Sequence, residues 1–374
     1  MAYPLAPVGP DAVGGTEQVL TRLDAALTRA GHRSIVMACD GSTITGELLA
    51  TPRPEGEITG DVRQRAWAYQ REAIRRALER YSVDLVHMHG IDFHQYLPPP
   101  GVPVLATLHL PPSWYPATIF ESGRPRTWLN CVSASQRQSC PPAAQLLPDV
   151  PNAVPVDALA VEGYAKHYFA LTLGRICPEK GFHLALDAAK IADIPLLIGG
   201  EVYPYPEHER YFREQVVTRL DAKRRFLGPV GFARKRRLLT GARCLVVPSL
   251  APETSSLVAM EALACGTPVV AFPVGALPEI VEHGRTGFLV RDVEEMAEAI
   301  RAAGTLDSGV CRAAARARFS DAEMARRYFA LYERIMEESH KEIDGAPDSV
   351  PDADTRHQPR MRGQTAVTAA SLPP

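Results

Sequence analysis

The chain has 374 residues, 46% of them hydrophobic, which is enough for two domains with separate apolar cores. Its 41 basic and 43 acidic residues nearly cancel, which argues against a molecule-wide field that attracts nucleic acid or an anionic membrane. No apolar run reaches the ~18 residues that span a bilayer, and the start MAYPLAPVGP lacks a signal-peptide pattern. We therefore expect a cytoplasmic protein without a transmembrane segment, although peripheral contact with a membrane stays open.

Cysteine usage adds a second limit. The chain has seven cysteines and no Cys-x-x-Cys pair. An odd count without paired spacing predicts buried, reduced thiols rather than a disulfide framework.

The amino-terminal half alternates helices and short apolar strands. Residues 16–30 predict a helix, because apolar side chains from Val19 to Leu27 share one face and Gly31 follows as a helix-ending glycine. After it we expect a strand at 34–38, a helix at 63–81, and strands at 84–89, 102–108 and 127–133. This order is typical of a parallel sheet covered on both faces. A proline-rich passage over 141–155 predicts the connection between two domains.

The alternation restarts after that passage and predicts a second α/β domain. Strands are expected at 169–173, 195–199, near 225, at 243–247 and at 268–271, and helices at 180–190, 207–220, 232–240, 255–264 and 293–303. Residues 341–374 are rich in Asp, Pro, Thr, Gln and Arg without periodicity, which predicts a disordered tail.

Two glutamates flank the start of the helix expected at 255–264. Glu253 lies in the loop before the helix and Glu261 lies inside it, while Gly266 follows as the helix-ending residue. The first helical turn offers unpaired N–H groups that favour a phosphate, and carboxylates accept pairs of sugar hydroxyls. The pattern indicates a nucleotide-sugar site; two solvated surface charges are the alternative interpretation of these residues alone.

Four motifs in order resemble the retaining glycosyltransferases of the GT-B fold, in particular family 4. Glu253 and Glu261 resemble its Glu-x₇-Glu signature, and Gly174-Arg175 through Glu179-Lys180-Gly181 resembles its GR-x₃-EKG element. The run CGTPVVA at 265–271, followed by Gly275, Pro278 and Glu279, resembles the carboxyl-terminal completion, and GGTE at 14–17 resembles the entry loop. These motifs and the return helix span residues 14 to about 335.

The resemblance implies an α/β fold of two doubly wound, Rossmann-like domains facing a cleft, with a carboxyl-terminal helix that crosses back to the first domain. On this basis we expect an acceptor-side domain at 1–155, a nucleotide-sugar domain at 156–318, the returning helix at 319–338 and a disordered tail at 339–374. It implies transfer of a hexosyl unit from a nucleoside-diphosphate sugar to an acceptor hydroxyl with retention of configuration.

The resemblance also implies roles for single residues. Arg175 and Lys180 would hold the diphosphate and stabilise the leaving group, Glu253 would bind the sugar hydroxyls, and Glu261 would bind the ribose. The remaining donor-binding positions are backbone contacts at Gly14, Gly15, Val230, Thr254, Ser255, Ser256 and Leu257. With two cations beside the diphosphate, neither a metal nor another cofactor is expected.

Three histidines are candidates for a role in sugar or metal binding. His109, at the end of the strand expected at 102–108, resembles the family's cleft histidine near the transferred sugar, with a polar filler at a strand end as the alternative. His87 and His89 point to one face of their strand, but without a third ligand at recognisable spacing we do not expect zinc.

A basic run and an aromatic loop complete the candidates. Residues 234–237 spread over more than one helix face without aromatic partners, so we interpret them as a solvated face rather than a nucleic-acid patch. Trp114, Tyr115 and Phe120 lie in a loop that could form a stacking platform for an acceptor of unknown class, whether saccharide, lipid-linked or small molecule.

Two departures from the family pattern are present. Only Met1–Leu5 precedes the proline-rich approach to the glycine loop, so the first strand is expected to be absent or much shortened, or the start to lie upstream. Thr254-Ser255-Ser256 stands where Pro-Phe-Gly often follows the first glutamate, which narrows the approach and bears on which sugar fits.

Competing functions share the fold. A nucleotide-sugar epimerase should show additional acid and base carboxylates, and none is identified here. A phosphorylase needs a lysine for pyridoxal phosphate and a much longer chain. A non-catalytic nucleotide-sugar-binding protein could lose Arg175, Lys180 or Glu253, and all three are present.

Overall fold

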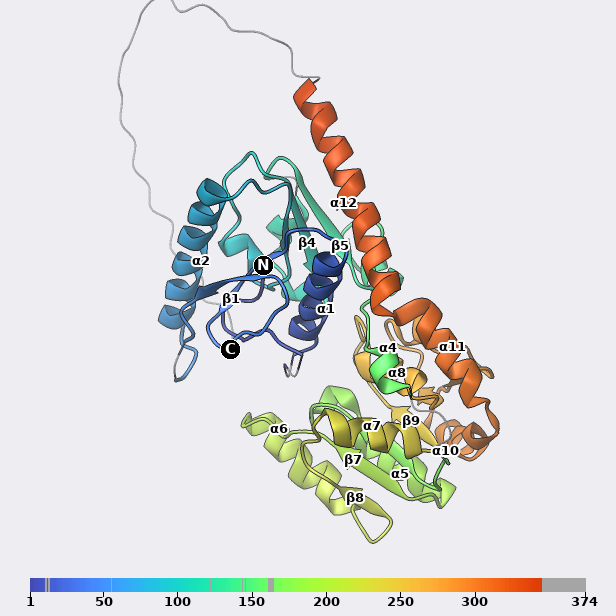
Figure 1. Cartoon of the computed structure of the whole chain (residues 1–374). Helices are drawn as coiled ribbons and strands as arrows, with labels where there is room; N and C mark the ends of the chain where they lie inside the picture. The colour runs from blue at the N-terminus through green and yellow to red at the C-terminus, as the bar shows by residue number, and fades with distance from the viewer. Residues whose placement is uncertain are drawn as a thin grey trace, which may run out of the picture.

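The computed structural model describes residues 1–344 except 11, 13, 55, 122, 143, 145 and 161–164. Two α/β domains lie one above the other, and a long helix, α12, runs along the amino-terminal domain (Figure 1). The tail predicted from residue 339 lies mostly outside the described residues, but its first part is helical because the last helix continues to Asp344.

The amino-terminal domain contains two small parallel sheets. Its elements are α1 (Gly15–Arg29), β1 (Ile35–Cys39), β2 (Glu47–Thr51), α2 (Gly60–Arg80), β3 (Val86–Met88), β4 (Val104–Leu108), β5 (Thr127–Cys131) and α3 (Ala134–Gln138), with 3-10 turns at Phe93–Gln95, Pro112–Trp114 and Ala117–Phe120. One sheet pairs β1 with β2, and the other has the order β3-β4-β5. The described residues before α1 form no named strand, and among them Met1 bonds to β3 while Ala2 bonds to β1.

The second domain is built on a six-stranded parallel sheet of order β11-β10-β9-β6-β7-β8. Its strands are β6 (Ala170–Leu173), β7 (Leu196–Gly199), β8 (Arg224–Phe226), β9 (Cys244–Val247), β10 (Val269–Ala271) and β11 (Gly287–Leu289). Its helices are α4 (Val156–Leu159), α5 (Phe182–Ala192), α6 (Pro206–Tyr211), α7 (Phe232–Gly241), α8 (Leu257–Ala264), α9 (Leu277–Ile280), α10 (Val293–Ala302) and α11 (Ser308–Phe319). Short 3-10 turns lie at Pro178–Lys180 and Ala303–Thr305.

The sheet order makes the second domain doubly wound. The chain steps outward from β6 through β8, returns to place β9 beside β6, and steps outward again to β11. Helices on both faces bury the strands, so apolar residues of β6 and β9 contribute to two cores. One core includes Leu171 and Leu245, and the other includes Ala170 and Val246. The alternation of apolar runs and helices predicted this architecture correctly.

One predicted helix is interrupted. Instead of a single α-helix over 207–220, α6 is followed by a π-helical segment at Phe212–Val216 and a 3-10 turn at Val217–Arg219. Val216 is buried in the core of the second domain, and the partly buried Phe212 packs against the same core. The changes of helical pitch keep both side chains facing the core, whereas a uniform α-helix would rotate them away from it. Local periodicity in the sequence does not reveal this packing constraint.

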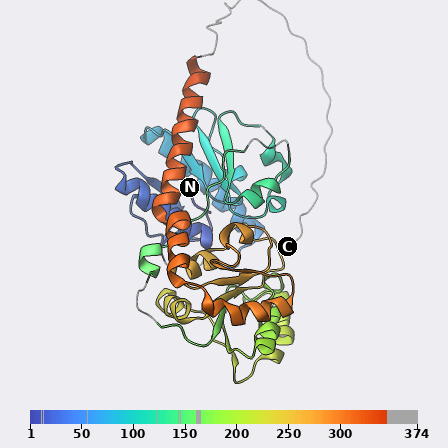
Figure 2. The ribbon, with the colours of Figure 1, turned by 90° about the vertical axis from the view of Figure 1, so that its right-hand side faces the viewer.

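The last helix, α12 (Asp321–Asp344), follows α11 after a bend at Ser320 and runs along the amino-terminal domain (Figure 2). Met324, Tyr328 and Ile335 share a buried cluster with Val19 and Leu23 of α1. This packing confirms the expectation that a carboxyl-terminal helix crosses back to the first domain.

Two further findings concern the whole described chain. All seven cysteines are buried and free of disulfides, as their spacing predicted. Among the described helices, none combines the length and the apolar character that crossing a bilayer requires.

Asp24 of α1 anchors the segment between β1 and β2 and generates a stability prediction. Its carboxylate is 1% exposed and accepts from the Ser34 hydroxyl at 2.6 Å and from the amides of Thr45 and Gly46 at 2.7 and 3.1 Å. Asp24→Ala should lower the free energy of unfolding by about 3 kcal/mol, because buried donors lose a charged acceptor. Urea unfolding measures this loss.

The matched control is Asp157→Ala, since Asp157 forms only an exposed pair with Arg316 at 2.7 Å. It should cost less than about 1 kcal/mol. Equal losses in the two variants would contradict the anchoring role of Asp24.

Candidate functional site

The candidate site lies where the winding direction of the second sheet reverses. Strands β6 and β9 are neighbours there, and the loops that follow them leave from the carboxyl edge of the sheet. In open α/β sheets this switch point leaves a crevice in which ligands bind. The loop after β6 carries Arg175 and Lys180, and the loop after β9 carries Glu253.

The two loops touch along their backbones. The Leu250 amide donates to the Glu179 carbonyl at 2.8 Å. Gly181 has φ +62°, and a Cβ there would lie 2.1 Å from the Pro248 carbonyl oxygen. Because only glycine permits both this dihedral and this approach, the glycine of the Glu-Lys-Gly motif sets the separation of the loops.

Lys180 and Glu253 form an ion pair across these loops. The ammonium nitrogen lies 2.6 Å from Oε1, which also accepts from the Ser249 hydroxyl. The Glu253 side chain is 10% exposed and that of Lys180 is 32% exposed, so the cation faces the solvent side of the pair. The structure thus brings together two residues that lie far apart in the sequence.

Gly275 holds the backbone of Glu253. Its φ is +58°, and a Cβ would approach within 2.2 Å of the Glu253 carbonyl oxygen, which also accepts from the Ala276 amide at 2.7 Å. The carboxylate therefore projects from a main chain that is fixed by a tight turn.

Glu261 has a partner that the sequence interpretation missed. It is buried on α8, and its Oε1 lies 2.6 Å from the ammonium of Lys235 on α7. The basic run 234–237 is therefore not uniformly solvated, and the earlier interpretation is wrong for Lys235. Its position four residues before buried Leu239, on the inward side of the helix, is the signal that would have identified it.

Residues of the amino-terminal domain reach the start of α8. The Thr254 hydroxyl donates to the His109 carbonyl at 2.8 Å. A Cβ on Gly15 would lie 2.9 Å from a methyl group of Leu257, so a larger residue would displace that side chain. Loops from both domains therefore meet at the first turn of α8.

The start of α8 has polar groups that no described side chain satisfies. The helix begins at Leu257 after Ser256, and no side chain caps it. Within the described chain, the buried Ser255 hydroxyl has no hydrogen-bond partner. Free helix N–H groups beside an unpartnered hydroxyl, with Lys180 on the adjoining loop, form a setting suited to an anion.

His109 belongs to a buried histidine network. Its Nε2 lies 2.9 Å from Nδ1 of His89, and the rings of His89 and His87 are 4.0 Å apart. His87 also bonds to the hydroxyls of Tyr332 of α12 and Thr107 of β4, both at 2.7 Å. Burial lowers the pKa of His109 to about 4 and the pKa values of His87 and His89 well below the ordinary value, so all three are neutral at pH 7.

The predicted site residues Arg175, Val230 and Gly14 lie in three separate environments. Arg175 is exposed on the loop after β6. Val230 is partly buried between β8 and α7, where it packs against the core. A Cβ on Gly14 would displace the carboxylate of Glu17 from its present position. Burial raises the pKa of Glu17, which is 8% exposed.

The prediction of an aromatic platform is wrong, because two of its three residues are buried. Tyr115 and Phe120 are 6% and 8% exposed and belong to the core of the amino-terminal domain. Only Trp114 of the three is exposed, at 60%. The Tyr115 hydroxyl instead accepts from the His109 amide at 3.1 Å and so supports the backbone of that histidine.

Glu279, known from the sequence only as part of a motif, joins the two domains. Its carboxylate accepts from the amides of Ala134 and Ser135 at 2.9 and 2.6 Å. These are the first amides of α3, so a side chain of the second domain binds the start of a helix in the first. The sequence did not predict this contact, because Glu279 and α3 are far apart in the chain and meet only in the folded structure.

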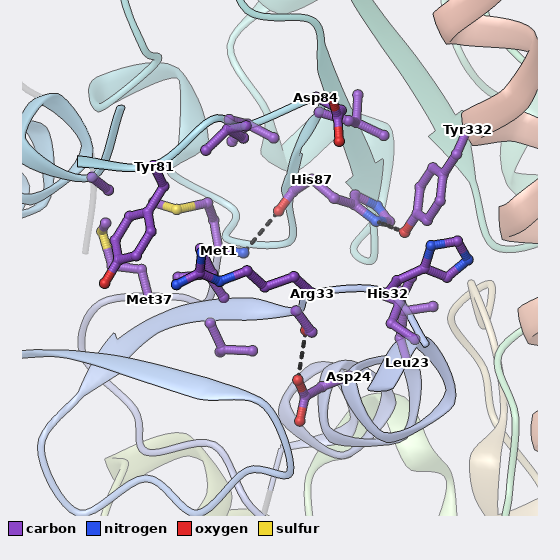
Figure 3. A pocket seen from close by; sticks show the side chains of 18 of the residues that line it. Met1, Leu23, Asp24, His32, Arg33, Met37, Tyr81, Asp84, His87 and Tyr332 are labelled. Carbon is purple, nitrogen blue, oxygen red and sulfur yellow. Dashed lines mark hydrogen bonds between the residues drawn. The ribbon is translucent and has the colours of Figure 1, made fainter. Parts of the chain in front are cut away.

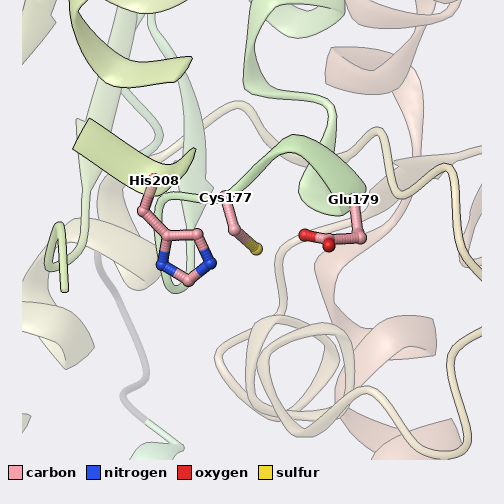
Figure 4. A group of neighbouring side chains, drawn as sticks. All are labelled: Cys177, Glu179 and His208. Atoms are coloured by element: carbon pink, nitrogen blue, oxygen red, sulfur yellow. The ribbon is translucent and has the colours of Figure 1, made fainter. Parts of the chain in front are cut away.

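Cys177, Glu179 and His208 form a small cluster (Figure 4). One potential ligand atom from each lies within 4.8 Å of the others. Tetrahedral zinc needs ligand atoms about 3.5 Å apart, so the side chains would have to move closer. Burial raises the pKa of the Cys177 thiol, which keeps it protonated. The expectation that the site is metal-free stays a prediction.

The sequence was compared with known protein families. The family described as Glycosyltransferase Family 4 matches residues 13–139, and the family described as Glycosyl transferases group 1 matches residues 168–304. The first match contains Gly14, Gly15 and His109. The second contains Arg175, Lys180, Glu253 and Glu261.

Curated relatives match part of the chain. A D-inositol 3-phosphate glycosyltransferase of Mycolicibacterium paratuberculosis is 36% identical over 162 residues, which cover 41% of this chain and 35% of that protein. An uncharacterized glycosyltransferase of Methanocaldococcus jannaschii is 32% identical over 138 residues, which cover 37% of each chain. The aligned segments thus span little more than a third of these relatives.

Solved structures share the fold over most of the chain. Sucrose-phosphate synthase from Thermosynechococcus elongatus has a TM-score of 0.71 at 22% identity and covers 90% of this chain and 98% of its own. HepE from Anabaena, in complex with UDP and glucose, has a TM-score of 0.67 at 20% identity and covers 89% and 98%. The expected GT-B fold is confirmed.

The buried histidines generate a pH prediction. The unfolded chain binds protons at these side chains near pH 6.5, whereas the folded chain does so only at lower pH, and for His109 near pH 4. The free energy of unfolding should therefore fall as the pH decreases from about 6.5 towards 4, by up to about 1.4 kcal/mol per pH unit for each histidine. Urea titrations at pH 7, 6 and 5 measure this slope.

His89→Gln removes one titrating ring from the network and should reduce the slope. His283→Gln is the control, because His283 is exposed and should leave the slope unchanged. A free energy that does not vary between pH 5 and 7 would show that the three rings are not held neutral.

Proposed function

Because the chain consists of a Family 4 glycosyltransferase domain followed by a group 1 glycosyltransferase domain, we propose that it transfers a hexosyl unit from a nucleoside-diphosphate sugar to an acceptor hydroxyl with retention of configuration. The ion pair of Lys180 and Glu253 at the switch point carries this proposal. It sets a cation for phosphate and a carboxylate for hydroxyls next to the open first turn of α8.

Donor binding divides between the two loops and α8. Lys180 and Arg175 bind the diphosphate and stabilise its growing negative charge as the glycosidic bond breaks. The amides of Ser255, Ser256 and Leu257 contribute further donors. Solved GT-B structures with bound UDP and glucose are consistent with this class of donor.

The carboxylates recognise hydroxyl groups at the two ends of the donor. Glu253 accepts from the hydroxyls of the transferred sugar, and Glu261, oriented by Lys235, accepts from the ribose. The backbone at Val230 contacts the base. Gly14 and Gly15 allow the entry loop to approach the donor where it faces α8.

His109 acts as a neutral hydrogen-bonding group beside the transferred sugar. Its bond to His89 fixes the orientation of the ring, and its low pKa excludes a permanent charge there. The proposal needs neither a covalent nucleophile nor a metal ion, because front-face substitution lets the leaving phosphate take the acceptor proton while cationic side chains hold the diphosphate.

The activity can be tested with labelled UDP-, GDP- and ADP-sugars and a panel of saccharide, lipid-linked and small-molecule acceptors. We expect one nucleotide to be released with formation of a glycoside that keeps the donor's anomeric configuration, as read by the proton coupling of the product. If no donor binds and no nucleotide is released, the transferase proposal is wrong. An inverted product would contradict retention alone.

Lys180→Ala should weaken donor binding by about 10- to 100-fold, because charge-assisted hydrogen bonds contribute about 1.5–3 kcal/mol. Calorimetric titration with the released nucleotide measures the change. Lys190→Ala, at an exposed position on α5, is the matched control and should bind normally.

Lys180→Gln separates charge from folding, because it keeps a polar side chain beside Glu253. It should bind donor as weakly as the alanine variant while its melting temperature stays close to that of the parent. Donor affinity equal to the parent in both variants would remove Lys180 from the site.

A further inference from the structure

Two cysteine sulfurs are in contact in the amino-terminal domain. Sγ of Cys131 lies 3.6 Å from Sγ of Cys140, and both side chains are buried. Neither residue is in a disulfide, so the contact joins two thiols. A disulfide places its sulfur atoms about 2.05 Å apart, so an approach of about 1.5 Å would bring this pair to bonding distance.

The two cysteines stand at the two ends of α3. Cys131 is the last residue of β5, and Cys140 follows the helix after its C-cap residue Ser139. They are nine residues apart in the chain. The segment between them therefore leaves the sheet, forms one short helix and returns to the strand that it left.

Hydrogen bonds of Gln136 hold this segment in place. Its side-chain amide donates to the Leu108 and Leu110 carbonyls at 2.9 and 2.8 Å. Its side-chain oxygen accepts from the Val132 amide at 2.8 Å, and its backbone amide donates to the Ser133 hydroxyl that caps the helix at 3.2 Å. These bonds fix α3 to the ends of β4 and β5, so the two sulfurs are held in contact by the fold.

The two sulfurs differ in exposure and in acidity. Cys131 is 0% exposed and Cys140 is 8% exposed, so an oxidant reaches Cys140 first. Donation from the Cys131 thiol to the Cys140 sulfur lowers the pKa of Cys140, and the same hydrogen bond together with burial raises the pKa of Cys131. Because the thiolate is the reactive form, Cys140 is the sulfur that reacts with an oxidant and Cys131 is the resolving thiol.

We infer that Cys131 and Cys140 form a reversible disulfide that bridges α3 when a peroxide oxidises the protein. The Cys140 thiolate attacks one oxygen of hydrogen peroxide, and the other oxygen leaves as hydroxide and takes up the proton that the thiol released. The Cys131 sulfur then attacks the sulfenic acid, and its proton leaves with the sulfenic oxygen as a second water. The two thiols lose two electrons and two protons, which the peroxide gains. A dithiol reverses the bridge by thiol–disulfide exchange.

The bridge acts on the helix that joins the two domains. The first amides of α3 donate to Glu279 of α9, and the disulfide closes a loop around this helix. A cross-link between the ends of a short segment restricts its local unfolding. The oxidised chain therefore holds the partner of Glu279 more firmly than the reduced chain. This inference is independent of the proposed transferase activity.

Mild oxidation of the full chain with hydrogen peroxide tests the bridge. Arg137 lies between the two cysteines, so trypsin separates them into different peptides unless a disulfide holds the peptides together. We expect the protein to lose the mass of two hydrogen atoms and its digest to contain residues 127–137 linked to residues 138–166. Dithiothreitol should separate the two peptides. A folded, peroxide-treated chain without this linked pair, or with either cysteine linked to another one, would overturn the inference.

Variants that remove one thiol separate the two roles. Cys131→Ala lacks the resolving thiol, so Cys140 should accumulate as a sulfenic acid that dimedone labels. Cys140→Ala should be labelled about tenfold less at Cys131, because a buried, protonated thiol reacts slowly. Equal labelling of the two variants would contradict these roles.

Cys311→Ala is the matched control, because it removes another buried, free thiol. It should form the linked peptides as the parent chain does. Their loss in this variant would make the bridge dependent on a third thiol and overturn the inference.

Hydrogen exchange measures the restraint on α3. Peptides covering 132–139 should exchange more slowly in the oxidised chain than in the reduced chain, whereas peptides from α5 should exchange equally in both. Equal exchange over 132–139 in the two states would contradict the restraint.

Discussion

The arrangement of the site depends on one contact. The first two amides of α3 donate hydrogen bonds to the carboxylate of Glu279. The two domains have separate cores, and the site draws on both, so its geometry is only as fixed as the position of one domain on the other. Glu279 meets the amides of Ala134 and Ser135 with two short hydrogen bonds, while Thr254 bonds to the His109 carbonyl nearby. Charge-assisted bonds to a helix start have a defined direction, which apolar packing lacks. They hold the start of α3 in the first domain against α9, which carries Glu279, in the second.

A second connection involves α12. Its Tyr332 bonds to His87 (Figure 3), whose ring lies 4.0 Å from the tilted ring of His89, and His89 bonds to His109. A line of neutral rings therefore connects α12 with His109 at the edge of the site. In the hydrogen bond between His89 and His109 one ring nitrogen donates and the other accepts, so the tautomers of these two rings are coupled. The packing of His87 against His89 adds a contact between α12 and this pair.

Most strands and helices were predictable because apolar runs and helical spacing are local properties. The positions of Glu253, Lys180 and Gly181 also followed from motif order. Tertiary contacts were not predictable: Lys235 looked like part of a solvated run, yet it turns inward to a buried carboxylate. Tyr115 and Phe120 looked like a surface platform, yet they complete a core. The pitch changes after α6 likewise depend on what lies against Val216, which no local pattern encodes.

The ion pair of Lys180 and Glu253 means that the ammonium already has a counter-ion within the protein. Under the proposed function, a donor diphosphate would draw Lys180 from a carboxylate 2.6 Å away, and the hydroxyls of the donor sugar would then bind that carboxylate. Binding is therefore an exchange of partners whose free energy is a difference between two pairs. A phosphate without a sugar would leave the Glu253 carboxylate with the Ser249 hydroxyl as its remaining partner. Under the proposed function, the site would therefore discriminate against simple anions because they lack the sugar hydroxyls.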